Sequence, residues 1–448
     1  MMINLPVGLF IGRNFIYDFD ATQAREAGPM SRGDAMDTET KPIDERAARA
    51  AHCPAVHADF SATLEAGSYW RLANEYRQMS PALFNTMAQG YWIFTDHEQV
   101  RDMYRNPDIF SSESITPWDP DPVYRFVPTQ VDAPDHITYR QILNPWFSPG
   151  SVDRAEPMAR EICRRLVAET VSSGQCDFVT GFALRYPTEV FLTMIGCPAA
   201  DANRFVPWVE DFFHGFGGDA EGVEPMVAAL NGIRDYWVAS LAERRHEPEA
   251  RPGDLASHLM HAKFGDRGLT DDEMLDMLTV LVLAGLDTTR AQLGYLFKYL
   301  AEHPQHRRRL MDEPELIPSA VEESLRLFTI IFGDGRKVAR DSDFHGCPLK
   351  RGDMVYGLVS AANRDPKVYD RPDEFVIDRK PNVHFGFAGG PHRCLGSHLA
   401  RREMQIAVEE WLRVIPDFRV ASTDPLMERG GGAMMTLLSL PLSWEVSA

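Results

Sequence analysis

The sequence predicts a mainly α-helical protein with a small β-rich portion. Between about residues 151 and 304, apolar residues recur at the spacing of helices that bury one face. After Arg340 the pattern changes to short apolar runs separated by turn residues, such as His345-Gly346 and Arg351-Gly352-Asp353. Residues 394–412 return to a helical pattern. These observations together favour helices packed beside a few short strands.

The helix that matters most for function is predicted at about residues 270–302. It begins with the capping-box spacing Thr270-Asp-Asp-Glu273 and ends before Pro304. At 1.5 Å per residue, such a helix is roughly 50 Å long. Its middle turns are apolar on nearly all faces, so we expect it to cross the centre of the protein.

Shorter segments complete the predicted order. Residues 90–95 read as a strand, residues 96–104 as a helix, and the proline-rich residues 115–134 as a long irregular loop that faces a substrate. Neither an internal repeat nor a clear linker occurs after residue 60. Residues 51–448 are therefore expected to form a single domain, preceded by residues 1–50 as a poorly ordered or loosely packed extension.

Composition limits the classes of function. The 448 residues contain 46 Lys and Arg against 65 Asp and Glu, a net charge of −19 that disfavours nucleic acid and anionic lipid as partners. Residues 5–11 lack the basic start of a signal peptide, and the apolar residues 277–286 are too short to cross a bilayer. The six scattered cysteines form no CxxC pair. We expect a cytoplasmic monomer outside the membrane.

The sharpest chemical signal is Phe387-Ala-Gly-Gly390-Pro-His392-Arg-Cys394-Leu-Gly396, directly ahead of a helical run. From the residue frequencies of this chain, the pattern Phe-x-x-Gly-x-x-x-Cys-x-Gly has about 0.002 expected chance matches. Glycines on both sides of Cys394 allow backbone N–H groups to turn toward its sulfur, and the helix start favours a thiolate. Such a thiolate is a good axial ligand for haem iron. The alternative is a buried structural cysteine beside a turn.

This loop resembles the haem-binding signature of the cytochrome P450 superfamily, and other segments agree in order. Glu323-Ser-Leu-Arg326 is similar to the structural Glu-x-x-Arg pair of the family, and Asn363-Arg-Asp-Pro366 with Pro372-Asp-Glu-Phe375 resembles the meander before the haem loop. The resemblance implies the cytochrome P450 fold around a buried haem b with the Cys394 thiolate as axial ligand. It also implies O2 as co-substrate and haem contacts from Phe387, Gly390, His392 and Gly396.

The centre of the long helix, Ala284-Gly285-Leu286-Asp287-Thr288-Thr289, carries the second site. Gly285 would let the helix pass close to a flat cofactor, and the Thr288 hydroxyl can bond to the carbonyl four residues earlier and open the helix. The segment resembles the oxygen-activating groove of the family, which implies proton delivery by Asp287 and Thr288. The alternative is an ordinary core helix that contains threonine.

Haem propionates need cations, for which arginine is the preferred partner. His136 and Arg140 lie four residues apart on one expected helix face, and Arg336 and His392 are further candidates. All four match family positions that hold propionates.

Within the family, segments such as Phe328-Thr329, Asp334-Gly335-Arg336 and His398-Leu-Ala-Arg-Arg402 look most similar to the bacterial camphor-hydroxylase group. In that group a loop tyrosine donates a hydrogen bond to the substrate, and Tyr124 falls at the matching place. Thr116 stands where the camphor enzymes have an aromatic residue, so camphor itself is disfavoured. We expect a small terpenoid, either a monoterpene or a norisoprenoid, in contact with Thr116, Tyr124, Leu283 and Gly285.

Bacterial members of this group take electrons from an acidic 2Fe–2S ferredoxin and its reductase. Arg101, Arg140 and Arg401 match positions on the face next to the thiolate and could bind such a partner. The resemblance therefore implies a ferredoxin-dependent monooxygenase that hydroxylates a C–H bond. A peroxide-driven peroxygenase and a haem-based sensor are the alternatives.

Overall fold

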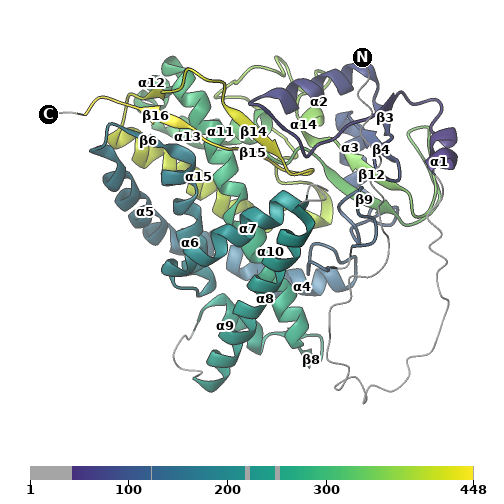
Figure 1. Cartoon of the computed structure of the whole chain (residues 1–448), viewed down its shortest axis with the longest axis horizontal. Coiled ribbons are helices and arrows are strands. Elements are labelled where there is room, and N and C mark those ends of the chain that lie inside the picture. Colours follow the sequence, from purple (N-terminus) through teal and green to yellow (C-terminus); the bar gives the residue numbers. More distant parts are fainter. Residues whose placement is uncertain (1–42, 123, 217–221, 248–252, 447–448) are drawn as a thin grey trace. The chain divides into compact units, whose positions relative to one another are not determined.

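The computed structural model describes residues 43–122, 124–216, 222–247 and 253–446 (Figure 1). Most of these residues are helical. The helices are α1 (Ile43–Arg49), α2 (Ser68–Met79), α3 (His97–Arg105), α4 (Asp135–Leu143), α5 (Pro149–Val171), α6 (Arg185–Ile195), α7 (Ala202–Phe216), α8 (Val223–His246), α9 (Leu255–His261), α10 (Asp271–Leu286), α11 (Thr288–Glu302), α12 (Pro304–Asp312), α13 (Ile317–Leu327), α14 (Val359–Ala362) and α15 (Ser397–Val414).

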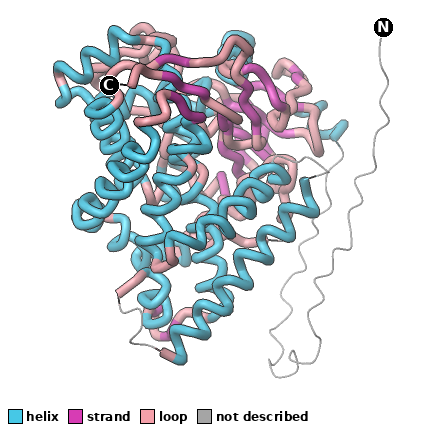
Figure 2. The backbone as a smooth tube through the Cα atoms, turned by 60° about the vertical axis from the view of Figure 1, so that its left-hand side comes forward, coloured by secondary structure: helices cyan, strands magenta, loops and turns pink. Residues whose placement is uncertain are grey.

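The strands are short, and most of them lie in the upper part of the view in Figure 2, whereas β7 (Lys263–Phe264) and β8 (Arg267–Gly268) lie at the lower end among helices. The largest sheet has the order β1 (Ala55–Val56), β3 (Ala82–Asn85), β4 (Tyr91–Phe94), β12 (Met354–Gly357), β9 (Asp334–Val338), β5 (Phe110–Ser111). Smaller sheets pair β10 (Ser342–Phe344) with β11 (Cys347–Leu349), and β7 with β8. Two three-stranded sheets contain β13 (Arg419–Val420), β16 (Pro441–Ser443) and β6 (Gln175–Asp177), and β15 (Met435–Leu437), β14 (Met427–Gly430) and β2 (Thr63–Glu65). The predicted combination of mainly helices with a small β-rich portion is confirmed.

The predicted long central helix exists as two helices, α10 and α11, with a break at Asp287. Its start is the predicted capping box: Thr270 Oγ1 accepts the N–H of Glu273, and Glu273 Oε2 accepts the N–H of Thr270 at 2.7 Å. At the break, the Thr288 hydroxyl donates to the carbonyl oxygen of Ala284 at 2.7 Å. This side-chain hydrogen bond occupies a carbonyl oxygen that would otherwise accept a backbone N–H of the helix, and the helix is interrupted at the predicted position.

The smaller predicted segments also have counterparts. The strand at residues 90–95 is β4, the helix at 96–104 is α3, and the described part of residues 115–134 contains neither helix nor strand. Of the predicted extension, residues 1–42 lie outside the described residues, and residues 43–49 form α1. In the described part of the chain, no helix is long and apolar enough to cross a membrane.

A buried ion pair joins α13 to the irregular segment ahead of the cysteine loop. Glu323 and Arg326 are both fully buried, and two 2.8 Å hydrogen bonds connect their side chains. Arg326 also donates to the carbonyl oxygens of residues 363, 372 and 374 at 2.7–3.0 Å, and Glu323 accepts from the Arg379 guanidinium at 3.0 Å. Because every charge has several partners, the pair fixes the path of the chain toward residues 385–396.

We expect Glu323→Gln to lower the free energy of unfolding by about 3–5 kcal/mol, because Arg326 and Arg379 would remain buried without a balancing charge. Urea unfolding followed by circular dichroism measures this loss. The matched control is Glu313→Gln, which removes the half-exposed i,i+4 partner of Arg309 and is expected to cost less than about 1 kcal/mol. Equal midpoints for the two variants would contradict a structural role for the buried pair.

Candidate active site

The loop that carries Cys394 is held by backbone hydrogen bonds and close packing. The Cys394 N–H donates to the Phe387 carbonyl at 3.0 Å, and the Gly396 N–H points at the Cys394 sulfur. Gly390 has a φ of +63°, and a Cβ there would lie 2.0 Å from the carbonyl oxygen of Tyr104. Only glycine fits this position, so α3 and the loop approach each other closely.

The pKa of the Cys394 thiol is raised, because the effect of burial exceeds that of the nearby groups that favour a thiolate. Burial raises the pKa of the thiol, whereas the Gly396 N–H and the charges of Arg140, Arg401 and Arg393 act in the opposite direction. The Cys394 side chain is accessible even though many protein atoms lie close to its sulfur. A sulfur in this setting is suited to bind a metal ion that compensates its charge.

Next to this sulfur, the structure brings together the four side chains predicted to hold propionates. The rings of His136 and His392 are in contact, with their centroids 3.9 Å apart and their planes tilted by 32°. Burial and the neighbouring arginines lower the pKa of His136 to about 4 and that of His392 to about 3, so both rings are neutral near pH 7. Arg336 pairs with Asp334 at 2.7 Å, but Arg140 is half-buried without a carboxylate partner among the described residues. The Arg140 charge fits a haem propionate, and the neutral imidazoles can donate hydrogen bonds to one.

The break between α10 and α11 places Asp287 in the interior. Its side chain is 3% exposed and is paired with Arg290, which also contacts Glu210 of α7 at 3.1 Å. Burial raises the pKa of Asp287, and the Arg290 charge opposes that effect. Asp287 is thus a buried acid whose arginine partner reaches a half-exposed carboxylate, and Thr288 follows it directly.

Gly285 does not have the packing role expected from the sequence. A Cβ on Gly285 would lie 2.7 Å from ring atoms of Phe191, so the missing side chain makes room for α6. The accessible small residue of this segment is Ala284, whereas Leu283 is buried in the core. Side chains of neighbouring residues in a helix point about 100° apart. The presence of small residues in the sequence therefore does not show which of them faces the neighbouring helix.

Two of the predicted substrate contacts lie together in the irregular loop. The side chains of Tyr124 and Thr116 lie close together, and the centroid of the Tyr124 ring lies 4.8 Å from that of Phe126. Burial raises the pKa of the Tyr124 phenol, and the negative charge of Asp119 raises it further. The hydroxyl of Tyr124 therefore stays protonated and able to donate a hydrogen bond.

The three arginines predicted to bind a redox partner differ in their surroundings. Arg101 is already paired with Glu98 at 3.0 Å and Asp102 at 2.9 Å. Arg401 is paired with Glu322 and stacks 4.4 Å from the Phe387 ring centroid. Arg140 is half-buried near Cys394. The sequence interpretation missed Arg393, whose exposed side chain has no ion pair in the described ranges; its position directly before Cys394 was the available signal.

A second missed residue is Glu403 on α15. Its carboxyl group is buried, contacts Thr289, and has one oxygen without a hydrogen-bond partner among the described residues. Burial holds its pKa well above the usual range, so it stores a proton close to the break in the central helix. A single glutamate in an amphipathic helix gives no sign of this in the sequence.

Comparison with known proteins identifies the family. The family model "Cytochrome P450" matches residues 221–444. The chain is 32% identical over 359 residues to a probable cytochrome P450 127A1 of Sinorhizobium fredii, which covers 80% of this chain and 84% of the relative. It is also 32% identical over 354 residues to cytochrome P450-terp of a Pseudomonas species, with coverage of 72% and 82%.

Solved structures agree with this result. The crystal structure of CYP101J2 superposes with a TM-score of 0.78 at 26% identity, covering 88% of this chain and 97% of the other. Further relatives of similar identity are named as a mycinamicin IV hydroxylase/epoxidase and a steroid C26-monooxygenase. The chain belongs to the cytochrome P450 family of bacterial type. It is a monooxygenase that carries haem b on a cysteine thiolate and uses O2.

The contact between Gly285 and Phe191 predicts a specific pattern of stability. We expect Gly285→Ala to destabilise the protein by about 1–3 kcal/mol, because its Cβ has no space beside the ring. Phe191→Leu in the same chain should recover most of this loss, which a double-mutant cycle of thermal unfolding measures. If Gly285 instead approached the cofactor, Phe191→Leu would give no recovery and haem content would fall in both variants.

Proposed function

We propose that Cys394 is the axial ligand of the haem and that His136, Arg140, Arg336 and His392 hold its propionates. The observation that carries this proposal is the accessible Cys394 sulfur, which has the Gly396 N–H and three arginine charges close to it. Phe387, Gly390 and Gly396 belong to the loop that would hold the haem. Glu323 and Arg326 act from outside the site by fixing the approach of the chain.

When bound, the haem would supply the iron at which O2 takes up two electrons and two protons, so that one oxygen atom enters a C–H bond and the other leaves as water. The chain itself must deliver protons to the reduced oxygen. Asp287 is suited to this because burial raises its pKa toward the working pH while the Arg290 contact keeps it in reach of exposed Glu210. The Thr288 hydroxyl, held by the Ala284 carbonyl, presents its oxygen at the opened helix as the next group.

The substrate that we propose is a small terpenoid, a monoterpene or norisoprenoid with one oxygen function. The Tyr124 phenol would donate a hydrogen bond to that oxygen, with Thr116 close beside it. Leu283 is buried in the core and Gly285 packs against Phe191, so the accessible residue of this turn of α10 is Ala284. The likeness to cytochrome P450-terp and to CYP101J2 supports a place near the camphor-hydroxylase group.

For the electron donor we propose a 2Fe–2S ferredoxin with its reductase. The chain carries a net charge of −19, so an acidic partner needs a local patch of positive charge. Arg393 and Arg140 lie beside Cys394, whereas Arg101 and Arg401 already have carboxylate partners. We place the enzyme in the cytoplasm on the basis of its six unpaired cysteines, as one domain over residues 51–448.

The first measurement is the optical spectrum of the reduced protein under carbon monoxide. We expect a red-shifted Soret band in the wild type and in the control Cys176→Ala, and its loss in Cys394→Ala, because only Cys394 supplies the thiolate. Titration with monoterpenoids and ionones should then shift the oxidised haem toward high spin. A histidine-type band would contradict the ligand assignment, and no shift with any terpenoid would contradict the substrate assignment alone.

The second measurement concerns proton delivery. We expect Asp287→Asn to lower kcat by about 100-fold, because general acid catalysis contributes a factor of this size. Thr288→Ala should keep consuming reductant but release hydrogen peroxide in place of product. Thr279→Val is the matched control, since Thr279 is a buried threonine of α10 whose hydroxyl has no partner among the described residues. Turnover with hydrogen peroxide alone that equals the ferredoxin-driven rate in all variants would favour a peroxygenase.

A further inference from the structure

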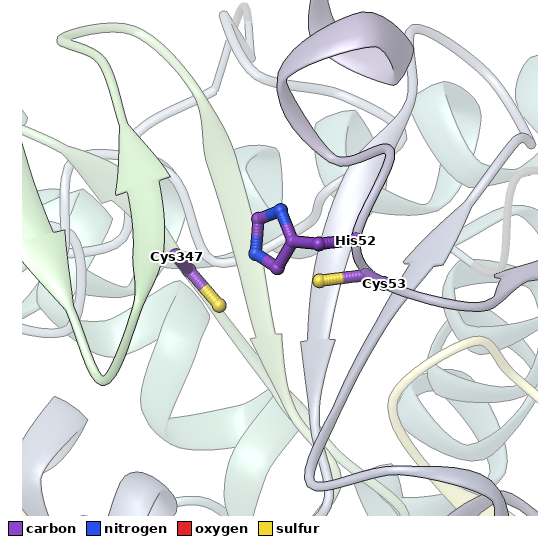
Figure 3. Close-up of side chains that lie close together, drawn as sticks. All are labelled: His52, Cys53 and Cys347. Atoms are coloured by element: carbon purple, nitrogen blue, oxygen red, sulfur yellow. The ribbon is translucent and has the colours of Figure 1, made fainter.

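A cluster of potential metal ligands lies on the β-rich side of the protein, apart from the haem-binding residues. One ligand atom each from His52, Cys53 and Cys347 lies within 4.8 Å of the other two. His52 and Cys53 belong to the turn between α1 and β1, and Cys347 is the first residue of β11. In Figure 3 the two sulfur atoms point toward each other, with the imidazole ring of His52 beside them. Nothing in the proposed mechanism uses these residues.

The two segments that carry the cluster are held together by contacts that do not involve it. The Arg49 guanidinium donates to the carbonyl oxygen of Pro348 at 2.8 Å and makes two hydrogen bonds to the Asp353 carboxylate at 2.7 and 2.8 Å. The turn itself is closed by a 2.8 Å bond from the Cys53 N–H to the Ala50 carbonyl. The ligands are therefore prepositioned, and binding would not have to bring distant segments together.

The hairpin that presents Cys347 is equally well defined. Phe344 and Cys347 face each other across the turn, where His345 and Gly346 have φ angles of +50° and +84°. The Gly346 N–H donates to the Asp343 carboxylate at 3.0 Å. The Cys347 side chain is buried against the cluster of core residues around Phe94 and Phe344, so its sulfur has little freedom.

We propose that His52, Cys53 and Cys347 bind a zinc ion that ties the turn after α1 to the β10–β11 hairpin. Two thiolates and one imidazole are a ligand set that favours zinc over hard cations such as Ca²⁺ and Mg²⁺. Tetrahedral zinc places two sulfurs about 3.8 Å apart. Small side-chain rotations within the 4.8 Å cluster are enough to reach this geometry.

The charge balance also suits a partly buried ion. Two thiolates neutralise Zn²⁺, and a water molecule would take the fourth position because three protein ligands come together among the described residues. Burial raises the pKa of both thiols, and Cys53 raises that of Cys347 further, to about 12. Binding of zinc therefore releases both thiol protons to water.

The experiment uses the full-length holoenzyme without a polyhistidine tag, purified with a phosphine reductant and desalted in the presence of added zinc. Elemental analysis gives the ratio of zinc to haem iron, and X-ray absorption at the zinc edge gives the ligands. We expect one zinc per chain, with two sulfurs at about 2.3 Å and lighter ligands at about 2.0 Å. Cys53→Ser and His52→Ala should weaken zinc binding at least tenfold in a chelator competition, since even outer-sphere contacts contribute that much.

Cys176→Ser is the matched control, because Cys176 is a partly buried cysteine on β6, outside the cluster, and should leave zinc binding unchanged. The carbon monoxide spectrum of every variant reports on folding and on the haem independently. Removing zinc should raise hydrogen exchange in residues 43–56 of the wild type. Wild-type protein without zinc, or zinc retained in both cluster variants, would overturn the proposal. So would a Cys53–Cys347 disulfide that takes up no zinc after reduction.

Discussion

The requirement that a sulfur carry negative charge inside the protein governs the arrangement around Cys394. Burial alone disfavours a thiolate, and the structure opposes this with the Gly396 N–H and with Arg140, Arg393 and Arg401. Those groups come from α4, from the loop and from α15, so the surrounding helices must be fixed precisely. Gly390, which accepts the close approach of Tyr104, and the Glu323–Arg326 pair, which directs the preceding segment, serve the same end.

The central helix meets a different demand, because a helix with a complete backbone ladder offers no polar group to its surroundings. Thr288 takes over the Ala284 carbonyl, and the break leaves Asp287 between two helices instead of within one. A buried acid would otherwise be costly, but Arg290 compensates its charge and connects it toward Glu210. The irregularity of this helix therefore matches the proton-delivery role that we propose for Asp287 and Thr288.

The residues proposed to bind haem and the cluster on the β-rich side differ in chemistry. Near Cys394, Arg140 has no carboxylate partner among the described residues and so fits an anionic cofactor. The cluster on the β-rich side collects thiols and an imidazole, held in place by Arg49 and Asp353, and so fits a soft cation. In both places the chemical type of the side chains indicates what would bind: a positive charge near Cys394, and thiols with an imidazole on the β-rich side.

From the sequence we could predict the helical class, the capped start at Thr270, the opening near Thr288 and the cysteine loop, because each depends on residues close together in the chain. The packing of distant segments was needed to show that Gly285 faces Phe191, that Thr116 and Tyr124 lie close together, and that Arg101 and Arg401 are paired with carboxylates. It also revealed buried Glu403 and brought Cys53 to Cys347. Local hydrogen bonding and hydrophobic period are encoded over a few residues, whereas burial and charge pairing depend on which distant segments pack together.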